Sequence, residues 1–100
     1  MSARGVKALF YEVANVGKRI KKSKKRYTWQ FELDSRNQKL DLYVSSLSGK
    51  RKVMLNGEIR YNGKKTGGVM FNHTFNLGNH LLSVIQFEGG YDLRIDNKSF

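Results

Sequence analysis

The chain has 100 residues, which limits it to one domain with at most a short tail. It contains no cysteine, so a disulfide framework and a thiolate metal site are both excluded. Its net charge of +11 predicts contact with an anionic surface, which nucleic acid, acidic lipid or an acidic protein face could supply.

The positive charge is concentrated in the first quarter of the chain. Residues 1–27 hold nine Lys or Arg and one acid, whereas residues 28–100 hold ten and seven. The domain is therefore divided into a basic N-terminal extension, residues 1–26, and a mildly basic folded part, residues 27–100. The N-terminus lacks the pattern of a secretory signal, and the absence of cysteine fits a cytoplasmic protein.

Apolar residues in the segment 4–20 recur at spacings of three and four, which is the period of a helix. They are Val6, Leu9, Phe10, Val13, Val16 and Ile20. The segment is therefore expected to be helical, although Gly17 and the β-branched residues weaken this prediction. Residues 6–16 could instead form an edge strand that packs on the folded part or on a second copy of the chain. The run that follows, "KRIKKSKKR", is expected to be frayed or extended in the absence of a partner.

From Tyr27 onward the apolar period becomes two, which predicts strands with one buried face. Turn residues separate these strands, and the Asn-Gly pair at 56–57 is the strongest hairpin signal. The almost continuous apolar run over 80–87 predicts the most central strand. The predicted strands cover residues 27–34, 38–46, 51–55, 58–62, 69–77, 80–87, 91–95 and 98–100. This pattern predicts an all-β protein, a compact antiparallel β-sandwich of about eight short strands. Because the last strand barely begins, we expect the chain to be a piece of a longer protein.

Several stretches between Tyr27 and Phe100 resemble the Fas apoptotic inhibitory molecule (FAIM) family. They are "YTWQFELD", "SGKRKVMLNGE", "FNLGNH" and "YDLRIDNKSF". The resemblance implies a β-sandwich without enzymatic activity that acts through protein contacts, in survival signalling or in protection against aggregation. The chain also resembles domains that lie beside coiled coils in proteins of flagellated and ciliated protists. The resemblance therefore also implies a cytoskeletal module of the cilium, flagellum or basal body.

Residues suited to catalysis or to metal binding are few and scattered. Two histidines, His73 and His80, could approach each other across a hairpin, but a zinc site needs three or four ligands. Ser83 and Asp92 could partner a histidine only by chance proximity. The glycine-containing loops lack the spacing of a phosphate-binding loop. We therefore expect no enzyme, no cofactor and no metal.

The aromatic residues allow two interpretations. Five aromatic residues could stack on nucleic-acid bases, but their alternation with polar residues is typical of a buried sheet face. These five residues are Trp29, Phe31, Phe71, Phe75 and Tyr91. Tyr43 and Phe87 fall on the opposite face from the main apolar set of their strands and are better candidates for an exposed contact.

The basic residues fall into two groups that are the candidate partner-binding site. The first comprises Lys18, Arg19, Lys21, Lys22, Lys24, Lys25 and Arg26. The second comprises Lys50, Arg51, Lys52, Arg60, Lys64 and Lys65, which surround the Asn-Gly hairpin. Neighbouring strands usually pair, so the second group should form one patch; the sequence does not show whether the first group lies beside it.

Three functions compete for these charges, and all three are non-enzymatic. The leading hypothesis is a protein-interaction module whose basic residues dock on an acidic protein surface, such as that of tubulin. Binding to nucleic acid and binding to an anionic membrane surface use the same charges. Self-association through an open sheet edge is a further alternative.

Overall fold

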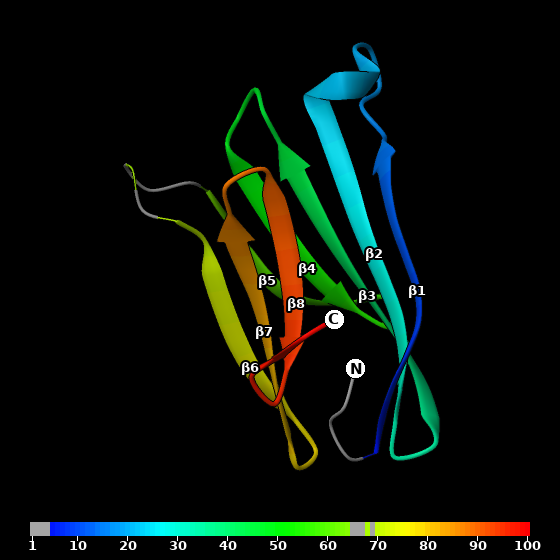
Figure 1. Ribbon diagram of the computed structural model, residues 1–100. Coiled ribbons are helices and arrows are strands. Elements are labelled where there is room, and N and C mark those ends of the chain that lie inside the picture. The colour runs from blue at the N-terminus through cyan, green and yellow to red at the C-terminus, as the bar shows by residue number, and fades with distance from the viewer. Residues whose placement is uncertain (1–4, 65–67, 69) are drawn as a thin grey trace.

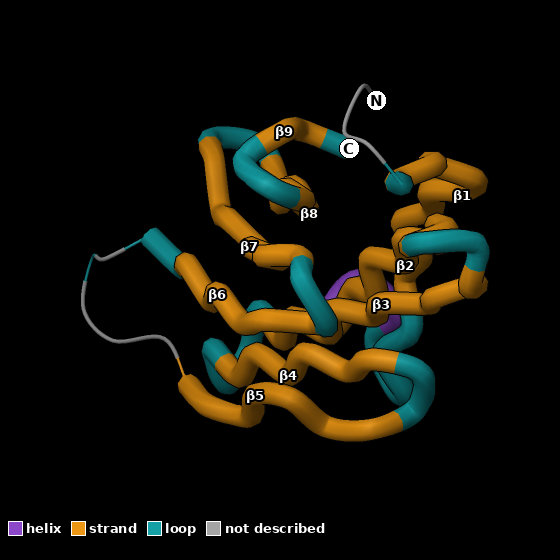
Figure 2. The backbone as a smooth tube through the Cα atoms, turned by 90° about the horizontal axis from the view of Figure 1, so that it is seen from below, coloured by secondary structure: helices purple, strands orange, loops and turns teal. Residues whose placement is uncertain are grey.

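Two antiparallel sheets pack face to face in a computed structural model that describes residues 5–64, 68 and 70–100 (Figures 1 and 2). The first sheet has the order β1-β2-β3-β4-β5, and the second has the order β6-β7-β8-β9. The strands are β1 (Val6–Asn15), β2 (Lys24–Leu33), β3 (Arg36–Ser45), β4 (Lys50–Leu55), β5 (Glu58–Lys64), β6 (Asn72–Leu77), β7 (His80–Phe87), β8 (Gly90–Ile95) and β9 (Lys98–Ser99). The predicted all-β sandwich is confirmed.

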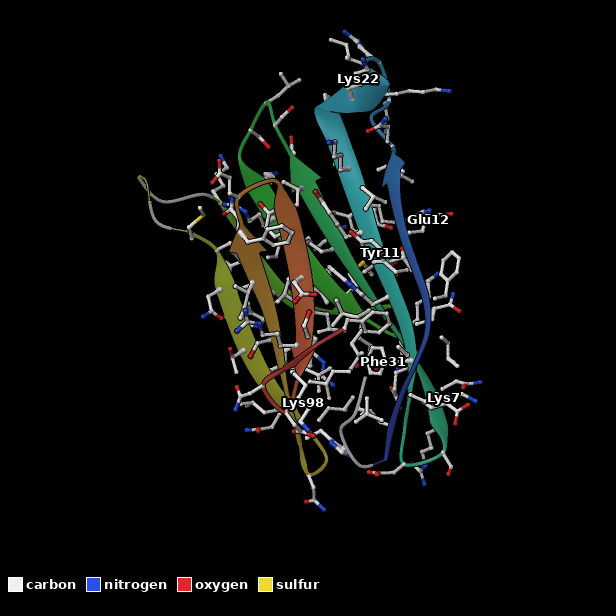
Figure 3. All side chains as sticks on the ribbon, viewed as in Figure 1. Lys7, Tyr11, Glu12, Lys22, Phe31 and Lys98 are labelled. Carbon is white, nitrogen blue, oxygen red and sulfur yellow. The ribbon has the colours of Figure 1, made fainter. Side chains whose placement is uncertain are left out.

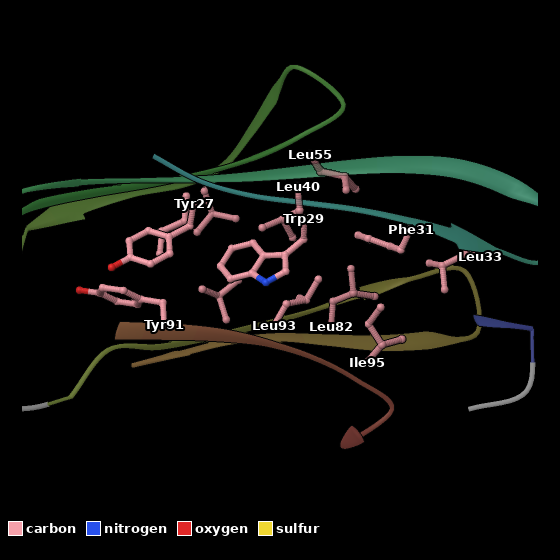
Figure 4. Close-up of a cluster of buried hydrophobic side chains, with 13 residues drawn as sticks. Tyr27, Trp29, Phe31, Leu33, Leu40, Leu55, Leu82, Tyr91, Leu93 and Ile95 are labelled. Atoms are coloured by element: carbon pink, nitrogen blue, oxygen red, sulfur yellow. The ribbon is translucent and has the colours of Figure 1, made fainter. Parts of the chain in front are cut away.

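The core lies between the sheets and follows from the alternation of each strand (Figure 4). On β2 the inward side chains include Trp29 and Phe31, which are almost fully buried. The rings of Tyr27 and Tyr91 meet edge to face across the two sheets, with their centroids 5.1 Å apart. The predicted burial of Trp29, Phe31 and Tyr91 is therefore confirmed, and these rings stabilise the packing of one sheet on the other.

Tight turns connect most of the strands, and they use the residues that such turns require. Asn56 and Gly57 have φ angles of 51° and 85°, as expected for a two-residue hairpin whose twist matches its strands. Asp34 and Ser35 form a second turn of the same kind, with φ angles of 50° and 69°. The predicted central position of residues 80–87 is also confirmed, because β7 lies between β6 and β8.

The helix expected within residues 4–20 is wrong, because Val6–Asn15 form β1, antiparallel to β2. The register shifts between Ala8 and Phe10, so that Leu9 has no partner on β2. Such a bulge moves the alternation by one residue, and Val6 and Val13 then face the same side although they are seven residues apart. A strand with a bulge therefore produced the spacing that indicated a helix.

The basic run joins β1 to β2, and the boundary expected at residue 26 falls inside β2. A single 3-10 turn spans Lys21–Ser23. Backbone hydrogen bonds close this connection: Val16 donates to Lys24 (2.8 Å) and Gly17 donates to Lys21 (3.0 Å). The run is thus part of the five-stranded sheet and its end loop. Within the described part of the chain, no helix is long and apolar enough to cross a membrane.

Candidate functional site

One end of the outer face of the five-stranded sheet carries most of the exposed positive charge. The outer face is the side of the sheet that points away from the four-stranded sheet. Lys24 pairs with Ser45 on β3, and Lys50 pairs with Lys64 on β5. Val44 pairs with Arg51, so Ser45 and Lys50 come next in the β3–β4 register. These four residues therefore form one row across β2 to β5, because cross-strand partners point to the same face.

The next row toward the middle of the sheet also carries basic side chains. Arg26 pairs with Tyr43, Tyr43 pairs with Lys52, and Lys52 pairs with Asn62. The Lys52 ammonium lies over the Tyr43 ring, 5.0 Å from its centroid. Strand pairing therefore brings together basic residues from both predicted groups, which are more than twenty positions apart in the sequence.

The β1–β2 loop adds the remaining charges at this end of the molecule, where Lys22 lies at its tip (Figure 3). The loop is fixed to the β3–β4 turn, because Ser46 donates both its backbone N–H (2.8 Å) and its hydroxyl (3.1 Å) to the Ser23 carbonyl. We call the combined surface the basic end. It comprises Lys18, Arg19, Lys21, Lys22, Lys24, Arg26, Lys50, Lys52 and Lys64.

A shallow depression of about 400 Å³ lies in the basic end. Its lining combines ammonium groups with hydroxyl and amide groups, all of which can donate hydrogen bonds to an anion. The lining residues are Lys24, Tyr43, Ser45, Ser48, Lys50, Lys52 and Asn62. The depression is therefore suited to a carboxylate or phosphate group of a larger partner.

Arg51 is a correction to the predicted site, because its side chain points into the sandwich and it is only 6% exposed. It lies between two outward residues, Lys50 and Lys52, so alternation places it inward. Its Nε donates to the Tyr91 hydroxyl (2.9 Å), and its guanidinium also donates to the Gln86 side-chain oxygen (3.1 Å). Arg51 therefore joins the two sheets and does not contribute to the basic end.

Two other predicted residues also stand apart from the basic end. Lys25 is exposed, but it points to the opposite side of β2 from Lys24. Arg60 lies at the register shift of β5, and its guanidinium lies over the Phe75 ring of β6, 5.4 Å from the centroid. It therefore turns toward the second sheet. Lys65 lies outside the described residues.

The acidic groups near the basic end already have partners. Glu12 lies 3.5 Å from the Arg26 guanidinium. Asp41 accepts a hydrogen bond from the Thr28 hydroxyl (2.6 Å), and its other oxygen lies 4.0 Å from the Lys39 ammonium. These two carboxylates therefore neutralise Arg26 and Lys39 in part.

The exposed aromatic candidates have different surroundings. Tyr43 lies within the basic end, beneath Lys52. Phe87 is 51% exposed and lines a second, mainly apolar depression of about 610 Å³, which opens between β1 and the β8–β9 pair. Both residues are thus accessible, as their alternation predicted, but only Tyr43 lies with the charges.

A histidine between two carboxylates lies at the opposite end of the sandwich, and the sequence did not reveal it. His80 Nδ1 lies 2.6 Å from Asp96, and His80 Nε2 lies 2.9 Å from Asp34. The hydrogen bond to Asp96 does most to raise the pKa of His80. A hydrogen bond from the Leu81 N–H, followed by the bond to His80, lowers the pKa of Asp96. Protonated imidazole can donate to both carboxylates, so the cluster joins the two sheets.

Folding stability should fall as the pH rises through the raised pKa of His80. The imidazolium contributes fully below its unfolded value of 6.5, and this contribution disappears as the folded protein loses the proton. At the acid end, the contribution of Asp96 is present above its unfolded value of 3.8 and is lost as the pH falls through its lowered pKa. We expect His80→Gln to remove the loss above neutral pH, measured as melting temperature against pH.

His73 supplies a matched control, because burial lowers its pKa. Its neutral ring lies beside Tyr61, with the ring centroids 4.8 Å apart. A histidine kept neutral in the folded state costs stability below pH 6.5, which is the opposite sign to His80. His73→Gln should therefore leave the alkaline loss intact. An unchanged alkaline loss in His80→Gln would show that another group is responsible.

The side chains that the sequence offered for catalysis do not assemble into a reactive group among the described residues. The Ser83 hydroxyl lies 2.9 Å from the Thr74 hydroxyl, and Asp92 accepts from Ser99 (2.6 Å). His73 and His80 are not cross-strand partners, because His73 pairs with Val84 and His80 with Leu77.

Comparisons with family models, with curated proteins and with solved structures find no significant match to this chain. The resemblance to the FAIM family therefore stays a prediction. The function must be inferred from the surface of the molecule, in which the basic end is the largest concentration of one charge.

Proposed function

We propose that this protein is a non-enzymatic docking module whose basic end binds an acidic protein surface, such as the acidic exterior of a microtubule. The observation that carries the proposal is the row of like charges across β2 to β5. Lys24 and Lys50 lie in one row and Arg26 and Lys52 in the next, and like charges gathered on one face repel one another. An acidic partner would relieve this repulsion on binding, so the arrangement favours association.

An acidic protein fits the surface better than nucleic acid does. Single-strand binders use several exposed aromatic rings on which bases stack. At the basic end the accessible ring is Tyr43, and Lys52 lies over it. Trp29 and Phe31, the other candidates for stacking on β2, are buried in the core. The contact is therefore built mainly from ammonium groups, which suit carboxylates spread over a protein surface.

A second candidate function, binding to an anionic membrane surface, is favoured by two exposed aliphatic side chains. Ile20 is 62% exposed in the β1–β2 loop, and Leu47 is 79% exposed in the β3–β4 turn. The hydrogen bonds between Ser46 and Ser23 hold these two connections together. Aliphatic tips among basic residues can enter the lipid interface while the charges contact acidic headgroups.

Co-sedimentation with microtubules across a salt series tests the proposal. The test variant is Lys24→Glu/Lys50→Glu/Lys52→Glu, which lowers the net charge from +11 to +5, two units for each reversal. We expect its affinity to fall by roughly tenfold to a hundredfold, since each reversal replaces attraction with repulsion. Its melting temperature should stay the same or rise, because exposed charges contribute little to folding.

The matched control is Arg36→Glu/Lys39→Glu/Arg94→Glu, which makes the same change in net charge at exposed positions outside the basic end. It should keep most of the binding. Equal losses in both variants would mean that net charge alone acts. Vesicles of phosphatidylserine and DNA of mixed sequence form the other two arms. Binding to vesicles that Ile20→Ser/Leu47→Ser abolishes, without binding to microtubules, would replace the proposal with the membrane function.

A further inference from the structure

The edge strand β1 exposes apolar side chains and an unpaired backbone. Its ten residues pair with β2 on one side, and no described strand lies along the other side. Leu9, Phe10, Tyr11 and Val13 are each more than 40% exposed. An open edge of this length with apolar side chains invites pairing with another strand.

The bulge at Leu9 makes β1 complementary to itself. Before the bulge, Val6 and Ala8 point inward and Lys7 points outward, as their partners on β2 do. After the bulge, the inward residues are Tyr11 and Val13, and the outward ones include Phe10 and Glu12. The inward and outward residues are therefore arranged symmetrically on the two sides of the Leu9–Phe10 pair.

We propose that two copies of this chain pair through β1, antiparallel and related by a two-fold axis at the bulge. In this register Val6 faces Val13 of the second copy, Lys7 faces Glu12, Ala8 faces Tyr11, and Leu9 faces Phe10. The three pairs outside Leu9 and Phe10 each join residues of one face, and each pair occurs twice because the interface is isologous. Four apolar side chains, Leu9 and Phe10 from each copy, then meet around the axis.

Charge complementarity supports a second copy as the occupant of this edge. Lys7 and Glu12 both point away from the four-stranded sheet (Figure 3). Lys7 is already opposite Glu32 on β2. In the dimer it would lie between Glu32 and Glu12 of the second copy, so that acidic and basic residues alternate across the joined sheets. Opposite charges in cross-strand pairs stabilise a register, whereas like charges disfavour it.

Pairing would place both basic ends on one face of a ten-stranded sheet. The two-fold axis is perpendicular to the sheet, so the outer faces of both copies point the same way. Because the strands are antiparallel, the basic ends lie at opposite ends of β1, on the order of 30 Å apart along the strands. Such a dimer could contact an extended acidic partner at two points, and its formation does not depend on that partner.

A charge swap tests the register by sedimentation equilibrium of the full chain. We expect a dimer for the unmodified chain. Lys7→Glu and Glu12→Lys should each weaken it by roughly tenfold or more, because each creates two like-charged pairs. The double variant Lys7→Glu/Glu12→Lys should recover most of the affinity, since the pairs between the two copies are opposite again. The like charges that it creates within each chain, beside Glu32 and beside Arg26, are the same in monomer and dimer. Lys39→Glu, a reversal on β3 of the same face, should leave the dimer unchanged.

Cysteine cross-linking gives a second measurement that does not depend on charge. The chain has no cysteine of its own, so single introduced cysteines report one contact each. A mixture of Lys7→Cys and Glu12→Cys chains should form a disulfide heterodimer, because cross-strand partners lie within reach of a disulfide. Each chain alone should cross-link far less, because the same residue in two copies is separated along the strands.

Two results would overturn the proposal. One is a monomer at every concentration up to the high micromolar range. The other is a dimer that the single reversals do not weaken, or that the folded double variant does not recover, with no preference for mixed cross-links. Circular dichroism of each variant shows whether it is folded. Because sedimentation contains only this protein, the dimer can fail or hold independently of binding at the basic end.

Discussion

Arg51→Ala is expected to lower the free energy of unfolding by about 2 to 4 kcal/mol, through lost hydrogen bonds and lost packing. The side chain donates to Tyr91 and to Gln86, which belong to the opposite sheet. Its guanidinium also lies over the Phe71 ring, 5.4 Å from the centroid. Lys50→Ala and Lys52→Ala should each change stability by no more than about 0.5 kcal/mol, since both side chains are on the surface. Urea unfolding followed by circular dichroism measures all three.

For binding at the basic end, we expect the effects of substituting these three residues to be reversed relative to their effects on stability. Lys50→Ala and Lys52→Ala should weaken association with an acidic partner, whereas an Arg51 variant that stays folded should bind normally. Arg51→Met keeps much of the packing volume and isolates the hydrogen bonds, so it should fall between arginine and alanine in stability. A stable Arg51→Ala protein with impaired binding would place this side chain on the surface and contradict its contacts with Tyr91 and Gln86.

Local signals made most of the fold predictable. A strand with one buried face alternates by itself, and a two-residue turn needs particular residues, such as Asn56 and Gly57. Both signals lie within a few neighbouring positions. The strand over 80–87 was recognisable from its composition, because a strand between two others in a sandwich has little contact with water.

The N-terminal strand, β1, could not be predicted as reliably from the sequence. Its bulge at Leu9 shifts the alternation, and the resulting spacing from Val6 to Val13 matches a helix as well as it matches an interrupted strand. The segment forms a strand and not a helix because the edge of β2 offers the backbone hydrogen bonds that β1 needs. That information lies outside the segment, so a local pattern could not contain it.

Most residues of the candidate site could be predicted from the sequence, but their assembly could not. Lys24 and Lys50 lie on one face only because β3 pairs with both of their strands. Arg51 could have been recognised as buried, because it alternates with Val53 and Leu55. His80 contacts Asp34 and Asp96, which are separated from it by 46 and 16 positions in the sequence. These contacts depend on how the chain folds and the two sheets pack, and no local sequence pattern specifies that packing.

Trp29→Ala should lower the free energy of unfolding by about 3 to 5 kcal/mol, a larger loss than that of Arg51→Ala. Trp29 is 1% exposed, and its ring stacks on Tyr27 with the centroids 6.0 Å apart. It also lies 5.7 Å from the Tyr11 ring, which helps to hold β1 on the sheet. In a domain of this size the melting temperature would fall by roughly 15 to 30 °C, measured by calorimetry.

Trp29→Phe and Tyr43→Ala distinguish a core ring from a recognition ring. Phenylalanine fills much of the space left by tryptophan, so Trp29→Phe should cost no more than about 1.5 kcal/mol. Tyr43→Ala removes an aromatic ring from the basic end and should leave the core intact. A Trp29→Ala protein that stays as stable as the unmodified chain but loses binding to single-stranded DNA would show that this ring is a stacking platform, and binding to nucleic acid would then be the better account of the charges. A large loss of stability, with normal binding by Trp29→Phe, would assign the ring to the core and leave recognition to the lysines around Tyr43.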